Sequence, residues 1–520
     1  MNIRRIHPTN DSVYGLFHSV AKTYPNLPAV ISGGRTYTFR QLDALATLYS
    51  QTIMEASERE PRPGKNSGYI GIVMNHGVEM IACILAVLKT GNAYVPAEPT
   101  FPKGRIRFMM EQARVDLVVT APEYTELFKD GTKLLFPDAA TAINAEMLSE
   151  NAVSDSTYVS DATSSPAYVL YTSGTTGNPK GVVVSNANVC HYARAFNAEF
   201  EIQPGKDRML QYSVCSFDIF VEEVFGSLLN GGALVIPAPE IRESVPQLAR
   251  FIREEGITIV SGFPYLLLEL DKLPTLPPSL RLLISGGDVL RSSYIKRLLS
   301  TGIAIYNTYG PSETTVCATY HRCDGTSPLE DGTYPIGHNV KGAEVVVIDS
   351  IGRPAAKGEI GEIAILGNGV SMGYLAECPE QKAFTTLADG RRAYLSGDLG
   401  YILPSGDLAF VRRKDNQVMI LGRRVECEEV DNVLCACPQV ERGIVTANYD
   451  TQGLAYLTAY FVPASQDFSI HEMKREMADR LASFMMPEYY VEMPSLPMNA
   501  NGKINRRALP IILKEGKLRS

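Results

Sequence analysis

The sequence is poor in cysteine, lacks tryptophan entirely and contains no hydrophobic run long enough to span a membrane. Nine cysteines in 520 residues are too sparse for a disulfide framework, so they predict reduced thiols in the cytoplasm. The strongest apolar run, Met80–Leu88, has about half the length of a membrane span. The charged N-terminus is not followed by the apolar segment of a secretory signal, which excludes that class of targeting peptide.

Positive charge is also in slight deficit. The chain has 49 Lys and Arg against 57 Asp and Glu, a net charge of −8, which excludes the basic footprint of a dedicated nucleic-acid or anionic-membrane binder. Its 45% hydrophobic and 20% charged content is typical of a globular protein and excludes disorder, collagen and coiled coil. No internal repeat of 20–50 residues is visible, so solenoids and propellers are excluded as well.

Strand-like and helix-like segments alternate over the first three fifths of the chain. Apolar runs at 167–173, 233–238, 280–287 and 304–310 end in turns that carry glycine, serine or proline, and helical patterns such as 77–90 lie between them. This alternation predicts a layered α/β fold with parallel strands. Folds of this kind bind ligands at the carboxyl ends of their strands, where these turns lie.

The pattern changes twice further along the chain. Residues 331–408 contain short runs rich in valine and isoleucine, separated by glycine and proline, which predict an antiparallel β-rich subdomain. The last hundred residues contain helical patterns at 426–435 and 471–483, which suit a small α+β domain. The short polar segment 412–416 between these regions suggests a hinge.

One segment after an apolar strand has the composition of a phosphate-binding loop. Residues 172–181 read TSGTTGNPKG, and small residues let backbone N–H groups approach an anion while hydroxyls and Lys180 add donors and charge. No Gly-Lys pair in the chain is followed by Ser or Thr, so the loop is not a Walker A loop.

This loop resembles the signature loop of the adenylate-forming superfamily, which includes acyl-CoA synthetases, luciferases and the adenylation domains of nonribosomal peptide synthetases. Other segments resemble the remaining motifs of the peptide-synthetase branch in order, and they lie at 85–99, 217–225, 307–315, 358–375, 394–400, 412–426 and 501–509. The resemblance covers nearly the whole chain. It implies a large N-terminal domain, residues 1–414, with two layered α/β subdomains and a β-rich subdomain, followed by a small mobile α+β domain, residues 415–520.

The resemblance also implies an ATP and Mg²⁺ site. Tyr309 would stack on adenine, Asn307 would contact its amino edge, and Asp398 would accept hydrogen bonds from the ribose hydroxyls. Glu313 would hold Mg²⁺, a cation that prefers carboxylate and phosphate oxygens, and Thr314 would contact the α-phosphate. The full implied set of nucleotide-binding residues is Thr172, Ser173, Gly174, Thr175, Thr176, Lys180, Gly287, Asp288, Asn307, Tyr309, Asp398 and Arg413.

Lys503 resembles the catalytic lysine of the family, whose charge would stabilise the transition state of attack on the α-phosphate. Asp415 matches the hinge residue about which the small domain would rotate between the two half-reactions. Two positions depart from the family pattern, because Arg412 stands where glycine is common and Asn505 where aspartate is common. Neither departure removes a group that carries the chemistry.

The motif at 217–225 predicts the substrate class. An aspartate at the position of Asp218 pairs with the α-ammonium in this branch, so an amino acid is expected. The implied pocket residues are Asp218, Ile219, Glu222, Tyr265, Ile284, Gly286, Thr308, Val316, Cys317 and Lys503. A buried Glu222 would need a cation or hydrogen-bond donors, which favours lysine, ornithine or diaminobutyrate, with Tyr265 shortening the pocket. An aliphatic amino acid, with Glu222 bonded locally, remains open.

The implied reaction has two steps, which form an aminoacyl-AMP and then a thioester on the phosphopantetheine thiol of a carrier protein in nonribosomal peptide or related biosynthesis. Competing hypotheses are an acyl- or aryl-CoA ligase on the same fold, a silent binding module, and a hydrolase that uses Ser371 in GVSMG. Whether the enzyme is free-standing or a domain of a larger synthetase, and whether a small activating protein assists it, stays open. Cys427, Cys435 and Cys437 are expected to be free thiols rather than a metal cluster.

Overall fold

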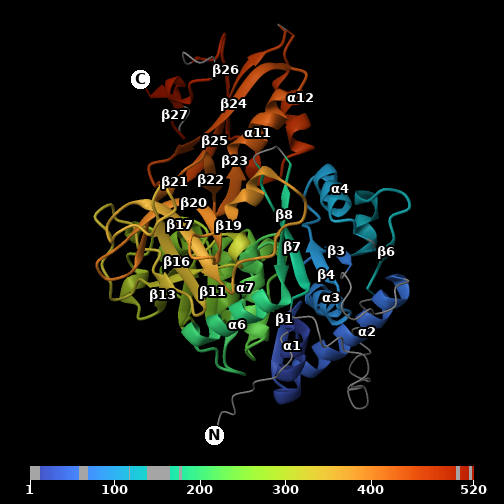
Figure 1. Ribbon diagram of the computed structural model, residues 1–520. Coiled ribbons are helices and arrows are strands. Elements are labelled where there is room, and N and C mark those ends of the chain that lie inside the picture. The colour runs from blue at the N-terminus through green and yellow to red at the C-terminus, as the bar shows by residue number, and fades with distance from the viewer. Residues whose placement is uncertain are drawn as a thin grey trace. The chain divides into compact units, whose positions relative to one another are not determined.

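A computed structural model describes residues 12–57, 68–115, 117–137, 164–174, 178–465, 467–498, 504–514 and 518–519. The chain divides into two compact units (Figure 1). Unit 1 comprises Met1–Pro99, Met110–Leu170 and Gly181–Arg412, and unit 2 comprises Thr100–Met109, Tyr171–Lys180 and Arg413–Ser520. Among the described residues, no helix has the length and apolar content needed to cross a membrane.

Unit 1 contains a nine-stranded mixed sheet in which six neighbouring strands are parallel. In spatial order its strands are β15 (His338–Asn339), β14 (Thr319–Arg322), β13 (Ala304–Tyr309), β12 (Leu282–Ser285), β11 (Ile259–Gly262), β9 (Arg208–Leu210), β10 (Ala233–Ile236), β1 (Pro28–Ser32) and β2 (Arg35–Thr38). The parallel strands β1 and β9–β13 confirm the predicted layered α/β fold.

A second, seven-stranded sheet has the order β18 (Gly373–Tyr374), β8 (Lys180–Ser185), β7 (Pro166–Thr172), β4 (Ala93–Pro96), β3 (Tyr69–Val73), β5 (Leu117–Thr120) and β6 (Leu134–Leu135). The helices are α1 (Val13–Thr23), α2 (Phe39–Ser57), α3 (Val78–Lys89), α4 (Lys103–Gln112), α6 (Asn186–Phe200), α7 (Asp218–Leu228), α8 (Pro239–Arg242), α9 (Val245–Glu254) and α10 (Pro264–Asp271). In α3 all residues but Glu79 and Lys89 are buried, as expected for a helix that is apolar on every side.

The region after the large sheets forms the predicted antiparallel subdomain. Its sheet has the order β16 (Ala343–Ile348), β17 (Gly361–Gly367), β20 (Arg392–Ile402) and β19 (Phe384–Thr386), and β21 (Leu408–Arg413) also pairs with β20. The β16–β17, β17–β20 and β19–β20 pairs are antiparallel, so this prediction is confirmed.

Unit 2 has its own core around α11 (Cys427–Cys435) and α12 (Ile470–Ala478). Its strands are β22 (Gln417–Ile420), β23 (Arg423–Glu426), β24 (Val440–Tyr449), β25 (Ala455–Pro463), β26 (Tyr489–Glu492), β27 (Ile511–Ile512) and β28 (Leu518–Arg519). The first two form a hairpin whose two turn residues, Leu421 and Gly422, have φ of 49° and 76°, as a type I′ turn requires. The helix predicted at 471–483 is shorter than expected, because α12 ends at Ala478.

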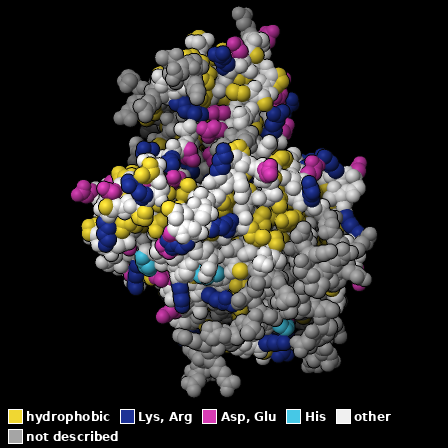
Figure 2. All heavy atoms as spheres, in the orientation of Figure 1, with side chains coloured by type: hydrophobic (Ala, Val, Ile, Leu, Met, Phe, Trp, Pro, Cys, Tyr) yellow, Lys and Arg dark blue, Asp and Glu magenta, His cyan; other side chains and the backbone are white. Residues whose placement is uncertain are grey.

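On the face shown in Figure 2, Lys and Arg side chains are interspersed with Asp and Glu rather than gathered in one basic patch. This distribution agrees with a chain of net charge −8. The described residues on this face therefore form no single basic patch of the kind that nucleic-acid binders carry.

Candidate functional site

The carboxyl ends of β12 and β13 bring several predicted site residues together in unit 1. These strands are parallel neighbours, with Ser285 opposite Asn307. Gly286, Gly287 and Asp288 therefore follow β12 at the same sheet edge where Thr308 and Tyr309 end β13. Burial raises the pKa of Asp288 to about 6, although the Val289 N–H and Arg291 oppose this shift.

Asn307 offers an unused acceptor in a buried position. Its Nδ2 donates to the carbonyl oxygens of Pro335 at 2.9 Å and Tyr334 at 3.4 Å. These bonds leave Oδ1 buried without a partner among the residues described by the structure, which is costly unless a ligand donates to it. The exocyclic amino group of adenine is such a donor, so this residue fits the predicted nucleotide.

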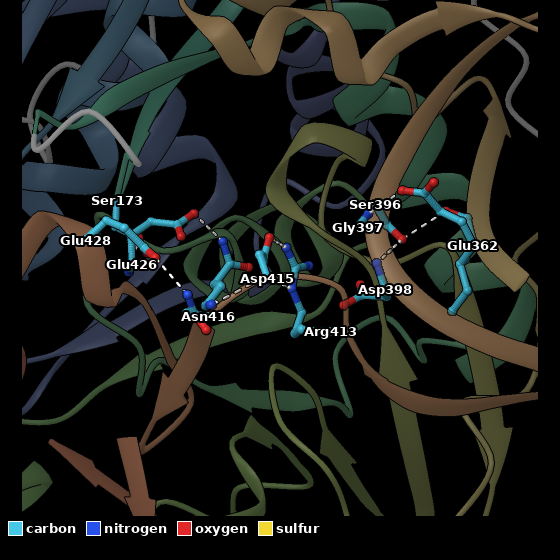
Figure 3. Close-up of polar contacts among 12 residues, drawn as sticks. Ser173, Glu362, Ser396, Gly397, Asp398, Arg413, Asp415, Asn416, Glu426 and Glu428 are labelled. Atoms are coloured by element: carbon cyan, nitrogen blue, oxygen red, sulfur yellow. Dashed lines mark hydrogen bonds and ion pairs between the residues drawn. The ribbon is translucent and has the colours of Figure 1, made fainter. Parts of the chain in front are cut away.

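Tyr309 and Asp398 are joined directly, since the Tyr309 hydroxyl donates to Asp398 Oδ2 at 2.6 Å. The backbone around Asp398 is fixed from β17, as Figure 3 shows. Gly397 N–H donates to Glu362 Oε1 at 3.2 Å, and Asp398 N–H donates to Ser396 Oγ at 3.1 Å. The predicted adenine and ribose residues thus form one connected group.

Glu313 lies in a short 3₁₀ turn, η4 (Ser312–Thr314), and is completely buried. Its Oε1 accepts a hydrogen bond from the Tyr374 hydroxyl at 2.7 Å, and its backbone oxygen accepts the Ser371 N–H at 2.9 Å. A carboxylate held in this way is a suitable ligand for Mg²⁺. Thr314 donates to the Pro311 oxygen at 3.0 Å.

The segment after η4 is strained. Thr315 and Val316 have φ of 61° and 70°, a conformation that β-branched residues rarely adopt. The Thr315 hydroxyl donates to the Gly369 oxygen at 2.7 Å, and the Ala318 N–H donates to the Tyr309 oxygen at 2.7 Å. Backbone strain of this kind is concentrated at functional sites, and here it sets the positions of the predicted pocket residues Val316 and Cys317.

Asp218 and Glu222 lie four residues apart on α7, so their side chains lie on the same face, one turn apart. Asp218 Oδ2 accepts a hydrogen bond from Ser312 Oγ at 2.6 Å. The predicted ammonium-binding carboxylate is therefore joined to the turn that carries Glu313.

Other predicted pocket residues differ in exposure. Ile219, Ile284 and Thr308 are buried, as are Val316 and Gly286. A Cβ atom at Gly286 would lie 2.7 Å from Thr308 Oγ1, so a larger residue there would require the Thr308 side chain to move. Tyr265, at the start of α10, is 38% exposed.

Glu222 is 1% exposed and forms hydrogen bonds with protein hydroxyls. Ser261 Oγ donates to Oε1 at 2.5 Å, and the Tyr192 hydroxyl donates to Oε2. Burial and the negative charge of Asp218 raise the pKa of Glu222 to about 7, whereas the two hydroxyls oppose the shift. A carboxylate with this pKa changes its charge close to neutral pH.

A second buried hydrogen-bond network holds the chain segment that precedes α7. Glu98 Oε1 accepts from His76 Nε2 at 2.8 Å and from the Cys215 N–H at 2.6 Å. His76 Nδ1 lies 2.7 Å from Gln211 Oε1, and Gln211 Nε2 donates to Glu223 at 3.0 Å. Burial alone would raise the pKa of Glu98, but the charge and hydrogen bond of His76 and the Cys215 N–H lower it to about 2.

Among the described residues, His76, Glu98 and Cys215 of this network form the one group of three potential metal ligands that was found. One ligand atom from each of these residues lies within 4.8 Å of the other two. Its carboxylate and imidazole are already hydrogen-bonded to each other. The network also holds successive backbone N–H groups, since Glu223 Oε1 accepts those of Tyr212 and Ser213. It fixes the segment that ends at Asp218.

The start of the predicted phosphate-binding loop lies in unit 2, where it contacts the segment that begins at β23. Ser173 Oγ donates to the Arg424 oxygen and accepts the Glu426 N–H, each at 3.2 Å. The Gly174 N–H donates to Glu429 Oε2 at 3.2 Å, and Arg105 pairs with the other oxygen of that carboxylate at 2.7 Å. Thr172 Oγ1 is buried and has no hydrogen-bond partner within the described part of the chain. Lys180 is buried.

The predicted hinge residue is paired within the same unit (Figure 3). Arg413 donates to both oxygens of Asp415, at 2.9 and 2.6 Å. Burial would raise the pKa of Asp415, but this bidentate pairing lowers it. Asn416 donates to Glu428 at 2.9 Å, so both residues after Lys414 are held by side-chain contacts.

Three predicted site residues, Thr175, Thr176 and Lys503, lie outside the described residues. Ser371, the nucleophile of the hydrolase hypothesis, is completely buried and accepts the Gly373 N–H at 3.4 Å. It is not presented to a substrate.

Comparison with known proteins decides the family. The family model described as AMP-binding enzyme matches residues 17–375, and that of the AMP-binding enzyme C-terminal domain matches residues 429–503. The chain belongs to the AMP-binding enzyme family. Its predicted membership of the adenylate-forming superfamily, in the branch of the peptide-synthetase adenylation domains, is confirmed.

This AMP-binding enzyme is 34% identical to bacitracin synthase 2 of Bacillus licheniformis over 97% of its own length but only 19% of that relative. Its fold is similar to that of an NRPS protein containing adenylation and PCP domains, with a TM-score of 0.81, 24% identity and coverage of 96% of this chain and 84% of that chain. It is also similar to the adenylation domain AlmE of Vibrio cholerae, with a TM-score of 0.78, 22% identity and coverage of 97% and 98%.

These similarities confirm the predicted adenylate-forming fold with a large N-terminal and a small C-terminal domain. At the level of the family, the prediction of an adenylate-forming ligase that uses ATP with Mg²⁺ is also confirmed. The residues of the AMP-binding enzyme that fit these ligands are Asn307, through its unpaired oxygen, and the buried Glu313.

Sequence reasoning missed Tyr192, Ser261, Ser312 and the His76–Glu98 pair. Glu98 lies inside a recognised motif, and an acid beside an apolar strand is the signal that could have identified it. Tyr192 and Ser261 lie in segments whose local pattern is that of an ordinary helix and an ordinary strand, so no local signal marks them.

Proposed function

We propose that the protein activates an amino acid with MgATP and then transfers it to a carrier-bound phosphopantetheine thiol. In the first step a substrate carboxylate oxygen bonds to the α-phosphorus while the bond to the β-phosphate oxygen breaks, giving aminoacyl-AMP and pyrophosphate. In the second step the thiol sulfur bonds to the acyl carbon, AMP leaves, and the thiol proton is released. The observation that carries this proposal is the pairing of Asp218 with Ser312, beside the buried Glu313.

The residues of this chain have distinct tasks in the first step. Asp218 would hold the α-ammonium, which orients the carboxylate toward the turn that carries Glu313 and Thr314. Mg²⁺, held by Glu313, would neutralise phosphate charge. Asn307, Tyr309 and Asp398, together with Gly287, Asp288 and Arg413, would hold the nucleoside, and Thr172, Ser173, Gly174, Thr175, Thr176 and Lys180 would hold the phosphates. Lys503 would stabilise the transition state.

The favoured substrate is a basic amino acid: lysine, ornithine or diaminobutyrate. Glu222 lies one helical turn beyond Asp218, where a substrate side chain would extend. Its two oxygens accept one hydroxyl each, and a carboxylate can accept about four hydrogen bonds. Acceptor positions therefore remain for a side-chain ammonium.

A second candidate is an aliphatic amino acid. The two hydroxyls already give Glu222 hydrogen-bond partners without any substrate, so a neutral carboxylic acid could remain there beside an apolar side chain. The pKa of about 7 allows either charge state near neutral pH.

ATP–pyrophosphate exchange across the proteinogenic amino acids plus ornithine, diaminobutyrate and β-amino acids tests this proposal. We expect exchange with basic amino acids and none with fatty or aryl acids. Absence of exchange with every amino acid would contradict amino-acid activation, and CoA-dependent turnover of a fatty or aryl acid would favour the ligase alternative. A preference for aliphatic amino acids would select the second candidate.

The carrier step rests on the relatives. The structure of the NRPS protein named above contains adenylation and PCP domains and is bound to a vinylsulfonamide inhibitor, which supports a carrier protein as partner. Incubation with MgATP, the activated amino acid and a set of phosphopantetheinylated carrier proteins should give a mass increase on one of them. Parallel assays with and without a small activating protein would decide whether that partner is needed.

A further inference from the structure

Glu222 lies where four elements of unit 1 meet. Tyr192 comes from α6, Ser261 from β11 and Tyr320 from β14, while Glu222 itself is on α7. All four side chains are at most 2% exposed. The Tyr320 hydroxyl donates to the Tyr192 hydroxyl at 3.2 Å, and Tyr192 in turn donates to Glu222. The carboxylate is therefore the acceptor at the end of a directed chain of hydroxyl groups.

The charge in this network is not balanced by a protein cation in the part of the chain that the structure describes, where no Lys, Arg or His is paired with Glu222. Burying a carboxylate that has only hydroxyl partners is unfavourable compared with an apolar side chain in the same space. A purely structural role would thus weaken the fold without any compensating gain. A cationic group that enters from the substrate side would supply the missing charge.

We propose that Tyr192 is a positioning residue for substrate selection, whose hydroxyl acts with that of Ser261 to hold the Glu222 carboxylate ionised and directed toward the side-chain ammonium of a basic substrate. This inference rests on the proposed amino-acid activation and names the substrate class of that same site. Hydroxyl donors act here because hydrogen bonds to the charged form of an acid favour that form. Tyr320 supports this arrangement through Tyr192.

The groups that face Glu222 explain why its charge is finely balanced. Asp218, one turn away, opposes ionisation, as burial does. The Cys317 thiol and the Tyr192 and Tyr320 hydroxyls lie close enough to sense the carboxylate, and their pKa values are all raised well above the ordinary range, chiefly by burial. Glu223 is adjacent, and burial raises its pKa too. These thiol and hydroxyl groups stay protonated, so the ionisation of Glu222 depends on donors rather than on cations.

Substrate selectivity of Tyr192→Phe tests the proposal. For the wild type and the variant, kcat/KM is measured by ATP–pyrophosphate exchange with ornithine, lysine, leucine and valine at pH 8. Loss of one hydrogen bond to a charged group should lower the ratio of basic to aliphatic kcat/KM about tenfold or more. Ser261→Ala should act in the same direction, and Ser261→Thr, which keeps the hydroxyl, should restore the ratio.

Tyr94→Phe is the matched control, because Tyr94 is a buried tyrosine of the same unit whose hydroxyl has no hydrogen-bond partner among the residues that the structure describes. This variant should leave the ratio unchanged. An unchanged ratio in folded Tyr192→Phe and Ser261→Ala would overturn the inference while amino-acid activation stands. A wild type that prefers leucine or valine would overturn it equally, again without affecting adenylation.

A second measurement separates this inference from the proposed function. Infrared difference spectra of wild type minus Glu222→Gln follow the carboxyl band of Glu222 as a function of pH, without any substrate. Tyr192→Phe should raise the titration midpoint by about one pH unit, because the removed donor favours the ionised form. If no amino acid supports exchange, the proposed function fails, and an unmoved midpoint would then also overturn the role of Tyr192.

Discussion

Glu222→Gln should change the pH dependence of stability, because glutamine has nearly the same shape as glutamate but cannot ionise. The side chain is 1% exposed and bonded to two hydroxyls that can reorient toward an amide. Differences in packing between the two proteins should therefore be small and independent of pH. The difference that remains reports the cost of ionising a carboxyl group in this position.

The magnitude follows from the shift in the pKa of Glu222. Burial and Asp218 raise this pKa from 4.5 to about 7 in the folded protein, while in the unfolded chain the group titrates near its ordinary value. Glu222 therefore contributes stability that is complete below pH about 4.5 and is lost as the pH rises through about 7. The loss amounts to about 3 kcal/mol, from about 1.4 kcal/mol per pH unit.

Urea unfolding of both proteins between pH 5 and pH 8, without substrate, measures this loss. The variant should gain stability over the wild type by about 2.5 kcal/mol across this interval, because a small part of the loss has already occurred at pH 5. Glu240→Gln, at an exposed position of α8, serves as the control and should run parallel to the wild type. A difference between Glu222→Gln and wild type that does not vary with pH would refute the reasoning.

Three further substitutions test other parts of the site. Ser312→Ala removes the 2.6 Å hydrogen bond to Asp218 and should raise the KM for the amino acid about tenfold without changing the KM for ATP. Equal changes in both KM values would contradict the role of Ser312 in positioning Asp218. Asn307→Leu should raise the KM for ATP and leave the KM for the amino acid unchanged in the same exchange assay. Glu98→Ala leaves His76 and the Cys215 N–H without their acceptor and should destabilise unit 1 by about 3 kcal/mol. This loss should appear as a lower Tm, and an unchanged Tm would contradict a stabilising role of the network.

Local sequence pattern was sufficient for much of the fold and part of the site. The helix α3 and the parallel strands could be predicted directly, because burial on every side leaves a continuous apolar run in the sequence. The shared face of Asp218 and Glu222 follows from helical geometry alone. The placement of Asn307 and Tyr309 follows from their position at the end of β13.

The partners of Glu222 could not be read in the same way. Tyr192 and Ser261 lie 30 and 39 residues from it in the chain. Ser261 is on β11, which pairs with β9 rather than with β10, the strand that precedes it in the sequence. Strand order is set by packing over the whole unit, which a local pattern does not contain. The exposure of Tyr265 has the same origin, since it depends on where α10 begins relative to the sheet.

The first six residues of α7 contain three carboxylates whose roles differ because their partners differ. Asp218 is bonded by the Ser312 hydroxyl, and Glu222 is bonded by two hydroxyls. Glu223, whose partners lie in the segment before α7, accepts the backbone N–H groups of Tyr212 and Ser213. Backbone donors cannot turn away, so Glu223 fixes the chain, whereas hydroxyls can rotate. Only the hydroxyl-bonded acids can therefore exchange or share their donors with an entering ammonium, which is what substrate recognition at Asp218 and Glu222 requires.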